Sequence, residues 1–379
     1  MKDHSLEVHG CHTYDATGAI SPAICLSATF RHPRFGESTG YDYGRVANPT
    51  RESLEKTVAL LERGGRSWAL SSGMAAVQLV FSLLSAGDHV LMSEDLYGGT
   101  VRLAEEVFAG YGITFEYVDV RDLALVGKRM RPETKLVFIE TPSNPMMQIS
   151  DIAALSALAH ENGALLAVDN TFLSPHFQKP LTLGADIVLH SGTKYLCGHN
   201  DVIAGFLVLK DATSAQAKRI ELLAKSAGPN LSALDSWLML RSIKTLGVRV
   251  ERQAENALAI ARWLGTLPEV TEVLYPGLAD HPGYALQQKQ TSGAGGMISF
   301  KVRSSEIAKA ALGKLHLIAF AESLGGVETL LTYPIAQTHA EMPAALLKRT
   351  GLDDKLLRLS VGIDDVEDLK ADLQQALQG

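Results

Sequence analysis

Short β-rich runs alternate with helical patterns between Arg51 and Leu209, and this alternation constrains the fold more than any other feature of the chain. A chain that alternates strands with helices forms a mostly parallel sheet with helices on both faces. The sequence therefore predicts an α/β fold. The expected strands are residues 68–70, 89–92, 115–118, 136–139, 165–168, 187–189 and 206–209.

The pattern changes after a long amphipathic run at residues 248–264. Later strand-like runs have fewer helical patterns between them, which indicates a smaller α+β domain. Residues before Pro49 are rich in Gly, His, Pro and Ser and show no sustained period, as expected for an extended arm. We expect an N-terminal arm (1–50), a large domain (51–245) and a small C-terminal domain (246–379). The later strands should be 270–275, 297–302, 315–320 and 358–361, followed by a closing helix at 364–377.

Charge and cysteine content narrow the class of function. The 379 residues include 35 basic and 42 acidic side chains, a net charge of -7, without a long Lys/Arg run. We therefore expect neither a nucleic acid nor a membrane surface as partner. The three cysteines are too few and too widely spaced for a disulfide framework, and the start lacks the apolar region of a secretory signal. These features predict a cytoplasmic enzyme with a small-molecule substrate.

Lys194 follows an apolar run that ends in small hydroxyl residues. Parallel sheets place their chemistry at such strand ends. A lysine held there can form a Schiff base with an aldehyde, and the hydroxyls of Ser191 and Thr193 can bind a phosphate. These groups match the needs of pyridoxal 5'-phosphate. Taken alone, the motif is equally compatible with a surface lysine in a polar turn.

Asp169 ends another apolar run, 25 positions before Lys194, which is about one strand-helix-strand step. A carboxylate at this place can keep the pyridine nitrogen of the cofactor protonated, so that the ring accepts electrons from the substrate Cα–H bond. A single Asp at a strand end is more often a loop or helix cap. The two residues in this order favour the cofactor site.

Gly73 and Met74 follow a third strand and open a helical run. Their backbone N–H groups are candidate phosphate donors, because the first N–H groups of a helix lack intrahelical partners. Tyr97 ends a further strand and can stack on the cofactor ring, or it can simply be a half-buried packing residue.

These segments together resemble the Cys/Met-metabolism family of pyridoxal-phosphate enzymes, which includes cystathionine γ-synthase and the cystathionine lyases. The resemblance runs nearly end to end. It implies a fold type I, aspartate-aminotransferase-like enzyme, with a homotetramer in which active sites are shared across each dimer. The matching segments are residues 41–45, 48–50, 71–76, 95–100, 140–145, 168–171, 191–195, 322–328, 338–340 and 358–362.

The resemblance also implies roles for individual residues. Tyr43 and Arg45 match the pair that reaches the cofactor phosphate of the neighbouring subunit. Arg358 matches the arginine that binds the substrate α-carboxylate, with Ser323 and Asn144 beside it. Lys194 is the expected attachment point and proton shuttle, and Tyr97 is the second catalytic residue, assisting proton transfer.

The reaction itself depends on smaller differences. Residues 331–339, which include Gln337, look more like the γ-synthase branch than like the lyases, where we expect Met at that position. The prediction is therefore cystathionine γ-synthase, which joins O-acyl-L-homoserine to L-cysteine. Cystathionine β-lyase, cystathionine γ-lyase and O-acetylhomoserine sulfhydrylase remain the alternatives.

A different class of function would be a metal-binding or regulatory protein. Potential zinc ligands occur near the N-terminus and after the lysine motif, but without regular ligand spacing. We therefore assign no metal ligand. The residues concerned are His4, His9, Cys11, His12, Cys197 and His199.

Overall fold

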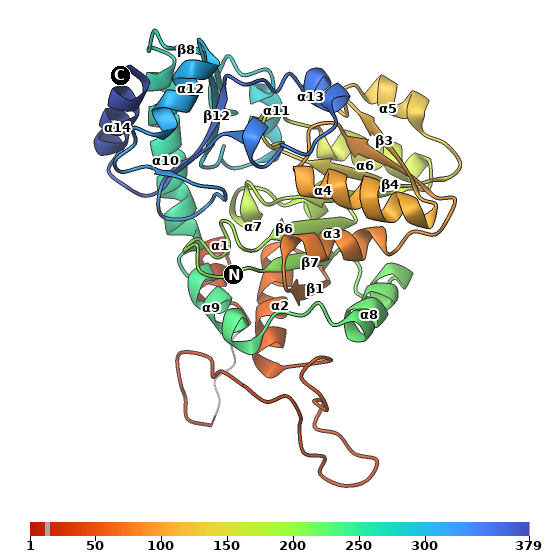
Figure 1. The fold of residues 1–379 in the computed structure, drawn as a ribbon. Helices are drawn as coiled ribbons and strands as arrows, with labels where there is room; N and C mark the ends of the chain where they lie inside the picture. Colours follow the sequence, from red (N-terminus) through yellow and green to blue (C-terminus); the bar gives the residue numbers. More distant parts are fainter. Residues whose placement is uncertain (12–15, 379) are drawn as a thin grey trace.

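A computed structural model describes residues 1–11 and 16–378, and a seven-stranded sheet lies at its centre (Figure 1). The strand order is β1-β7-β6-β5-β4-β2-β3. Strand β7 is antiparallel to both neighbours, and the other six run parallel to one another. The predicted mostly parallel sheet is confirmed. Its strands are β1 (Arg66–Leu70), β2 (His89–Ser93), β3 (Thr114–Val118), β4 (Thr134–Glu140), β5 (Leu165–Asp169), β6 (Ile187–Ser191) and β7 (Gly205–Leu209).

Helices cover both faces of this sheet, which explains why its strands are almost continuously apolar. Side chains alternate between the faces. Leu91 packs in the core with α2 (Pro49–Leu61), α5 (Leu123–Arg129), α6 (Ile152–Glu161) and α9 (Ala233–Ile243). Val90 and Met92 pack in the other core, with α3 (Gly73–Phe81), α4 (Gly98–Leu103) and α8 (Ala215–Ala227).

A five-stranded sheet follows in the C-terminal part, in the order β10-β11-β12-β9-β8. Three helices, α10 (Leu246–Leu264), α12 (Ser305–Leu312) and α14 (Val366–Gln378), pack on it around a separate core. The three-residue strand β11 was not predicted, and the run predicted at 315–320 forms a strand only at its end. The strands are β8 (Val270–Leu274), β9 (Met297–Val302), β10 (Ala319–Phe320), β11 (Leu330–Thr332) and β12 (Leu356–Ser360).

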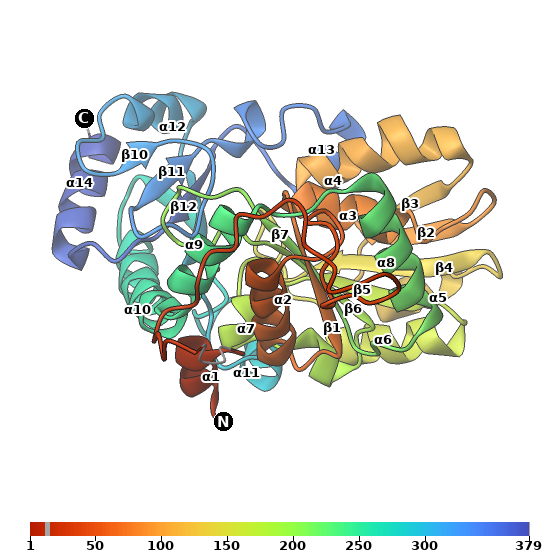
Figure 2. The ribbon, with the colours of Figure 1, turned by 90° about the horizontal axis from the view of Figure 1, so that it is seen from below.

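The N-terminal segment begins with the short helix α1 (Asp3–His9), which buries Leu6. Residues 16–48 contain no helix and form a long loop below the body (Figure 1). Seen from below, this arm runs from α1 across α2 toward α8 (Figure 2). The arm ends at Asn48, whose side chain accepts from the backbone N–H groups of Thr50 and Arg51 and so caps α2.

None of the helices in residues 1–11 and 16–378 combines the length and the apolar character needed to cross a membrane.

Shorter helical elements complete the fold. The remaining elements are α7 (Ser174–Phe177), α11 (Tyr284–Gln290), α13 (Ala344–Thr350), a π-helical turn at Ala104–Phe108, and 3-10 turns at Ala109–Tyr111, Pro180–Leu183 and Pro334–Ala336.

Candidate active site

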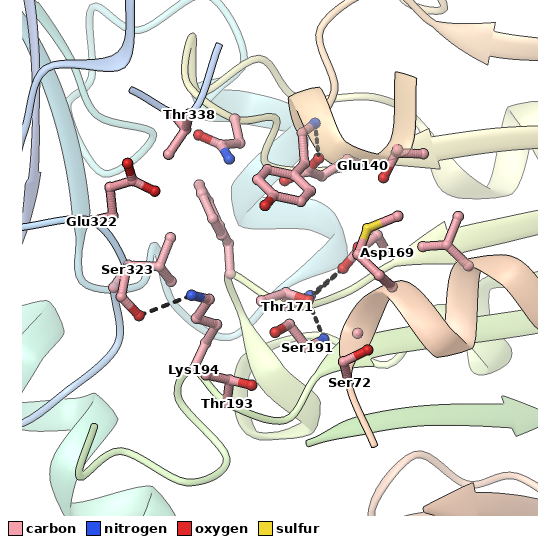
Figure 3. A pocket seen from close by; sticks show the side chains of 18 of the residues that line it. Ser72, Glu140, Asp169, Thr171, Ser191, Thr193, Lys194, Glu322, Ser323 and Thr338 are labelled. Atoms are coloured by element: carbon pink, nitrogen blue, oxygen red, sulfur yellow. Dashed lines mark hydrogen bonds between the residues drawn. The ribbon is translucent and has the colours of Figure 1, made fainter. Parts of the chain in front are cut away.

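A pocket of about 250 Å³ lies where β4, β5 and β6 end, between the two sheets (Figure 3). Parallel strands place their carboxyl ends at one edge of a sheet, so side chains from distant parts of the sequence meet there. The pocket wall includes ten of the twelve residues that the sequence singled out. These ten are Gly73, Met74, Tyr97, Asn144, Asp169, Ser191, Thr193, Lys194, Ser323 and Arg358.

Lys194 lies in the turn after β6 and points into the pocket. Its Nζ donates a hydrogen bond to Ser323 Oγ at 2.8 Å. Burial and the nearby Arg358 guanidinium lower the lysine pKa from 10.5 to about 8, against the opposing effect of the Glu322 carboxylate. About a tenth of the amine is therefore neutral at about pH 7, and only the neutral amine is a nucleophile.

Asp169 is the last residue of β5. Its Oδ1 accepts from Thr171 twice, from the backbone N–H at 3.0 Å and from the hydroxyl at 2.5 Å. Thr171 Oγ1 in turn accepts from the Ser191 N–H at 2.8 Å, which ties β5 to β6. Burial raises the pKa of Asp169 despite these hydrogen bonds. A cationic group of a ligand would therefore stabilise the charged carboxylate.

Helix α3 points its first turn at the pocket. Ser72 is its N-cap and accepts from the Ala75 N–H, while the N–H groups of Gly73 and Met74 have no intrahelical acceptor. A Cβ on Gly73 would approach Ser191 Cβ to 2.9 Å, so only glycine lets α3 approach β6 this closely. The helix start, with the Ser191 and Thr193 hydroxyls on the same pocket wall, has the donors that a phosphate requires.

Tyr97 lies at the start of α4 and is 38% exposed. Its backbone N–H donates to Glu140 Oε2 at 3.0 Å. Glu140 ends β4, and burial together with the neighbouring Asp169 raises its pKa well above the usual value. Glu140 therefore holds the backbone of Tyr97 in place, while the phenol ring remains accessible from the pocket.

Arg358, on β12, is 1% exposed. Its Nη1 donates to Asn144 Oδ1 at 2.7 Å and its Nη2 to the Ser323 carbonyl at 3.3 Å. The buried Nε has no hydrogen-bond partner, and burial lowers the pKa of the guanidinium to about 10. An unpaired N–H on a buried cation is costly unless a ligand pairs with it, and a carboxylate offers that partner.

Ser323, which bonds both Lys194 and Arg358, has a left-handed backbone with φ 94°. This conformation is unfavourable for a residue with a side chain, and such strain is typical of functional sites.

Tyr43 and Arg45 do not reach this pocket. They border a separate hollow beside the arm, with the Arg45 guanidinium 5.6 Å from the centre of the Tyr43 ring. Arg45 Nη1 donates to the Lys225 carbonyl on α8. Their assignment to the pocket of another subunit stays a prediction.

Several pocket residues were not assigned from the sequence. Most of them flank predicted site residues in the chain, so their position beside a strand end was the available signal. They are Ser72, Val77, Thr100, Glu140, Thr171, Phe172, Ile203, Glu322, Leu324 and Thr338.

In the described part of the chain, the metal-ligand candidates named from the sequence do not gather with one another. Cys197 is buried and its Sγ lies 3.1 Å from Asp201 Oδ1, while His199 Nδ1 lies 2.8 Å from the Cys197 carbonyl. His9 and Cys11 form no metal-ligand group with His4 among residues 1–11 and 16–378. His12 lies outside the described residues.

A lysine, a buried carboxylate and phosphate donors around one pocket at strand ends fit pyridoxal phosphate, so the fold and the site define a pyridoxal-phosphate enzyme of the α/β class. The family model for Cys/Met metabolism PLP-dependent enzymes matches residues 4–378, and the chain belongs to that family.

Curated relatives differ in the reaction that their names give. The chain is 47% identical to cystathionine gamma-lyase of Bacillus subtilis (strain 168) over 379 residues, all of both chains. It is 45% identical to cystathionine gamma-synthase/O-acetylhomoserine (thiol)-lyase of the same organism, over 97% of this chain and 94% of the relative. Among solved structures, cystathionine gamma synthase from Xanthomonas oryzae pv. oryzae, in complex with aminoacrylate and cysteine, matches with a TM-score of 0.96 and 40% identity. This match covers 100% of this chain and 98% of the other.

Proposed function

We propose that the chain is a cystathionine γ-synthase, which replaces the γ-substituent of O-acyl-L-homoserine with the sulfur of L-cysteine. The observation that carries this choice is the position of residues 331–339, the stretch that favours the γ-synthase branch. Thr338 from this stretch lines the pocket, and His339 Nε2 lies 3.0 Å from the Asn144 carbonyl. Gln337 Oε1 accepts from the Tyr333 N–H at 2.8 Å, which stabilises the turn that carries Thr338.

Cofactor binding is assigned to residues of the first sheet. Lys194 would carry the cofactor, and Asp169 would face its ring nitrogen. The phosphate would bind at the start of α3 and at the hydroxyl groups of the β6 turn. When bound, pyridoxal phosphate delocalises the electrons released when the substrate Cα–H bond breaks. The residues assigned to the phosphate are Gly73, Met74, Ser191 and Thr193.

Proton transfer is assigned to Lys194 and Tyr97. With a pKa of about 8, the Lys194 amine can accept the Cα proton and later return it to a neighbouring carbon. Its hydrogen bond to Ser323 orients the amine toward the pocket. The accessible Tyr97 phenol is suited to proton transfer at the substrate amine or the leaving group.

Substrate binding is assigned to Arg358, with Asn144 and Ser323 beside it. A fixed carboxylate holds the substrate Cα in one orientation above the pocket floor, and this orientation lowers the entropic cost of reaction. Glu322 lies on the same side of the pocket as Ser323 and Lys194 (Figure 3). We assign the Glu322 carboxylate to the amino group of the incoming cysteine. Sulfide has no amino group, so this contact would be made only in γ-replacement by cysteine.

The proposal also covers how the subunits associate through the arm and where in the cell the protein works. Ile20, Leu26 and Phe35 of the arm are strongly exposed, although large apolar side chains are normally covered. This supports packing of the arm against another subunit, where Tyr43 and Arg45 would reach the cofactor phosphate. The homotetramer itself is what the family resemblance implies. The unpaired thiols of all three cysteines support a cytoplasmic location.

The test begins with cofactor-loaded protein and cystathionine alone, and the products are identified by mass spectrometry. Pyruvate with homocysteine would make the protein a β-lyase, and 2-oxobutyrate with cysteine a γ-lyase. Negligible release, followed by cystathionine formation from O-acyl-L-homoserine and cysteine, is the expected result. Competition between cysteine and sulfide then separates the γ-synthase from a sulfhydrylase. Lys194→Ala is the matched inactive control.

A further inference from the structure

Three potential metal ligands meet on the side of the molecule where the N-terminal helix packs. His4 comes from α1, His176 from α7 and Glu251 from α10. One ligand atom from each lies within 4.8 Å of the others, and this is the only such group of three among residues 1–11 and 16–378. None of the three side chains lines the active-site pocket, so the proposed reaction leaves the group unexplained.

The two distances from the Glu251 carboxylate to the histidines match shared coordination better than hydrogen bonding. Glu251 Oε1 lies 3.4 Å from His4 Nε2 and 3.4 Å from His176 Nε2. Good N–H···O hydrogen bonds are shorter, about 2.7–3.2 Å. Around a tetrahedral zinc ion with bonds of about 2.0–2.1 Å, neighbouring ligand atoms are about 3.3 Å apart.

A second carboxylate, that of Glu7, orients His176. Glu7 is 4% exposed, and its Oε1 lies 2.7 Å from His176 Nδ1. The same carboxylate accepts from the Gly247 N–H at 3.1 Å, which fixes it in place. When His176 donates from Nδ1 to Glu7, its Nε2 lone pair faces Glu251. In that tautomer the two acceptors repel each other, and a metal ion between them would remove the repulsion. Metal-bound histidines in proteins commonly have such a carboxylate on their other ring nitrogen.

We propose that His4, His176 and Glu251 form a zinc site that fastens the N-terminal helix to the body of the enzyme. Two imidazoles and one carboxylate suit zinc, whereas magnesium and calcium prefer oxygen ligands alone. The His4 and Glu251 side chains are 61% and 46% exposed, so a water molecule can occupy the fourth position and the ion can enter from solvent.

The ion would join elements that lead directly to the active site. Helix α7 follows β5, which ends in Asp169, after a short loop. Helix α10 carries Arg249, whose Nη1 donates to the Tyr195 carbonyl at 2.8 Å, next to Lys194. The proposed site would therefore stabilise the positions of these elements. Its role is structural, and it takes no part in the chemistry.

The first experiment measures metal content in untagged, cofactor-loaded enzyme, dialysed against chelator, reloaded with zinc and dialysed again. We expect about one zinc ion per chain in the parent and a loss of at least tenfold in occupancy in His4→Ala and Glu251→Gln. Both side chains are exposed, so the variants should fold, and equal cofactor content verifies this. His9→Ala, on the same helix, is the matched control and should keep the zinc.

Two further measurements separate this site from chance binding. Cobalt loading should give the intense visible absorption of a tetrahedral ion in the parent and in His9→Ala, but not in His4→Ala. Glu7→Gln should weaken zinc binding by about 10–100-fold. Zinc absent from the reloaded parent, or retained equally in His4→Ala and Glu251→Gln, would overturn the proposal. Neither result bears on the proposed reaction.

Discussion

Attachment of pyridoxal phosphate to the cofactor-free protein should become faster as the pH rises to about 8 and then level off, because we assign the attack to the neutral amine of Lys194. The lysine pKa falls from 10.5 to about 8 through burial and the Arg358 guanidinium. At about pH 7, this change raises the neutral fraction from about 0.03% to about 10%, or about 300-fold.

Stopped-flow absorbance over a pH series measures this prediction directly. Below the midpoint, the rate should rise about tenfold for each pH unit. Reaction of the cofactor with a simple alkylamine, run in parallel, corrects for titration of the cofactor itself. Arg358→Leu should move the midpoint to higher pH, because a repelling positive charge is removed. Glu322→Gln should move it to lower pH, because an attracting negative charge is removed. A corrected rate that still rises about tenfold between about pH 8 and about pH 9, as an unperturbed lysine amine would give, would refute the reasoning.

Three other substitutions test separate parts of the structure. Asp169→Asn should retain the covalently attached cofactor, seen in its visible spectrum, but lower kcat by at least about 100-fold, because the carboxylate that we assign to the ring nitrogen is lost. Arg358→Lys should lower kcat/KM by about 10–100-fold, because one of the charged hydrogen bonds that we assign to the substrate carboxylate is lost. The cofactor spectrum should stay unchanged, and unchanged steady-state kinetics would contradict the assignment. Phe81→Ala, at a fully buried ring that packs against Phe108, Phe115 and Phe138, should lower the free energy of unfolding by about 3–5 kcal/mol in urea titration.

The sequence predicted the first sheet well because its strands are buried on both faces. Their apolar runs end sharply at polar residues, and Asp169 and Lys194 both stand at such ends. Since parallel strands share one carboxyl edge, their meeting followed from topology alone. The three-residue strand β11 could not be predicted, because its pattern is too short to be distinguished from a loop.

Electrostatic properties of the site were beyond sequence reasoning for a different reason. Glu140 ends a strand just as Asp169 does, and its raised pKa arises because both carboxyl groups are buried together. The unpaired Nε of Arg358 likewise depends on which acceptors happen to surround the guanidinium. Such properties are set by packing between the two sheets, and no local pattern encodes them.

The residues assigned to the cofactor and those assigned to the substrate come from different parts of the chain, which explains why the cofactor is easier to infer than the reaction. Lys194 and Asp169 come from the first sheet and its turns, as do the residues assigned to the phosphate. Glu322, Thr338 and Arg358 come from the C-terminal part and form the other wall of the pocket. Substitutions in that wall can change which group approaches the substrate while the cofactor remains bound as before. We therefore expect the choice between γ-replacement and elimination to depend on residues 322–339, the segment assigned to the substrate side chain and the second amino acid.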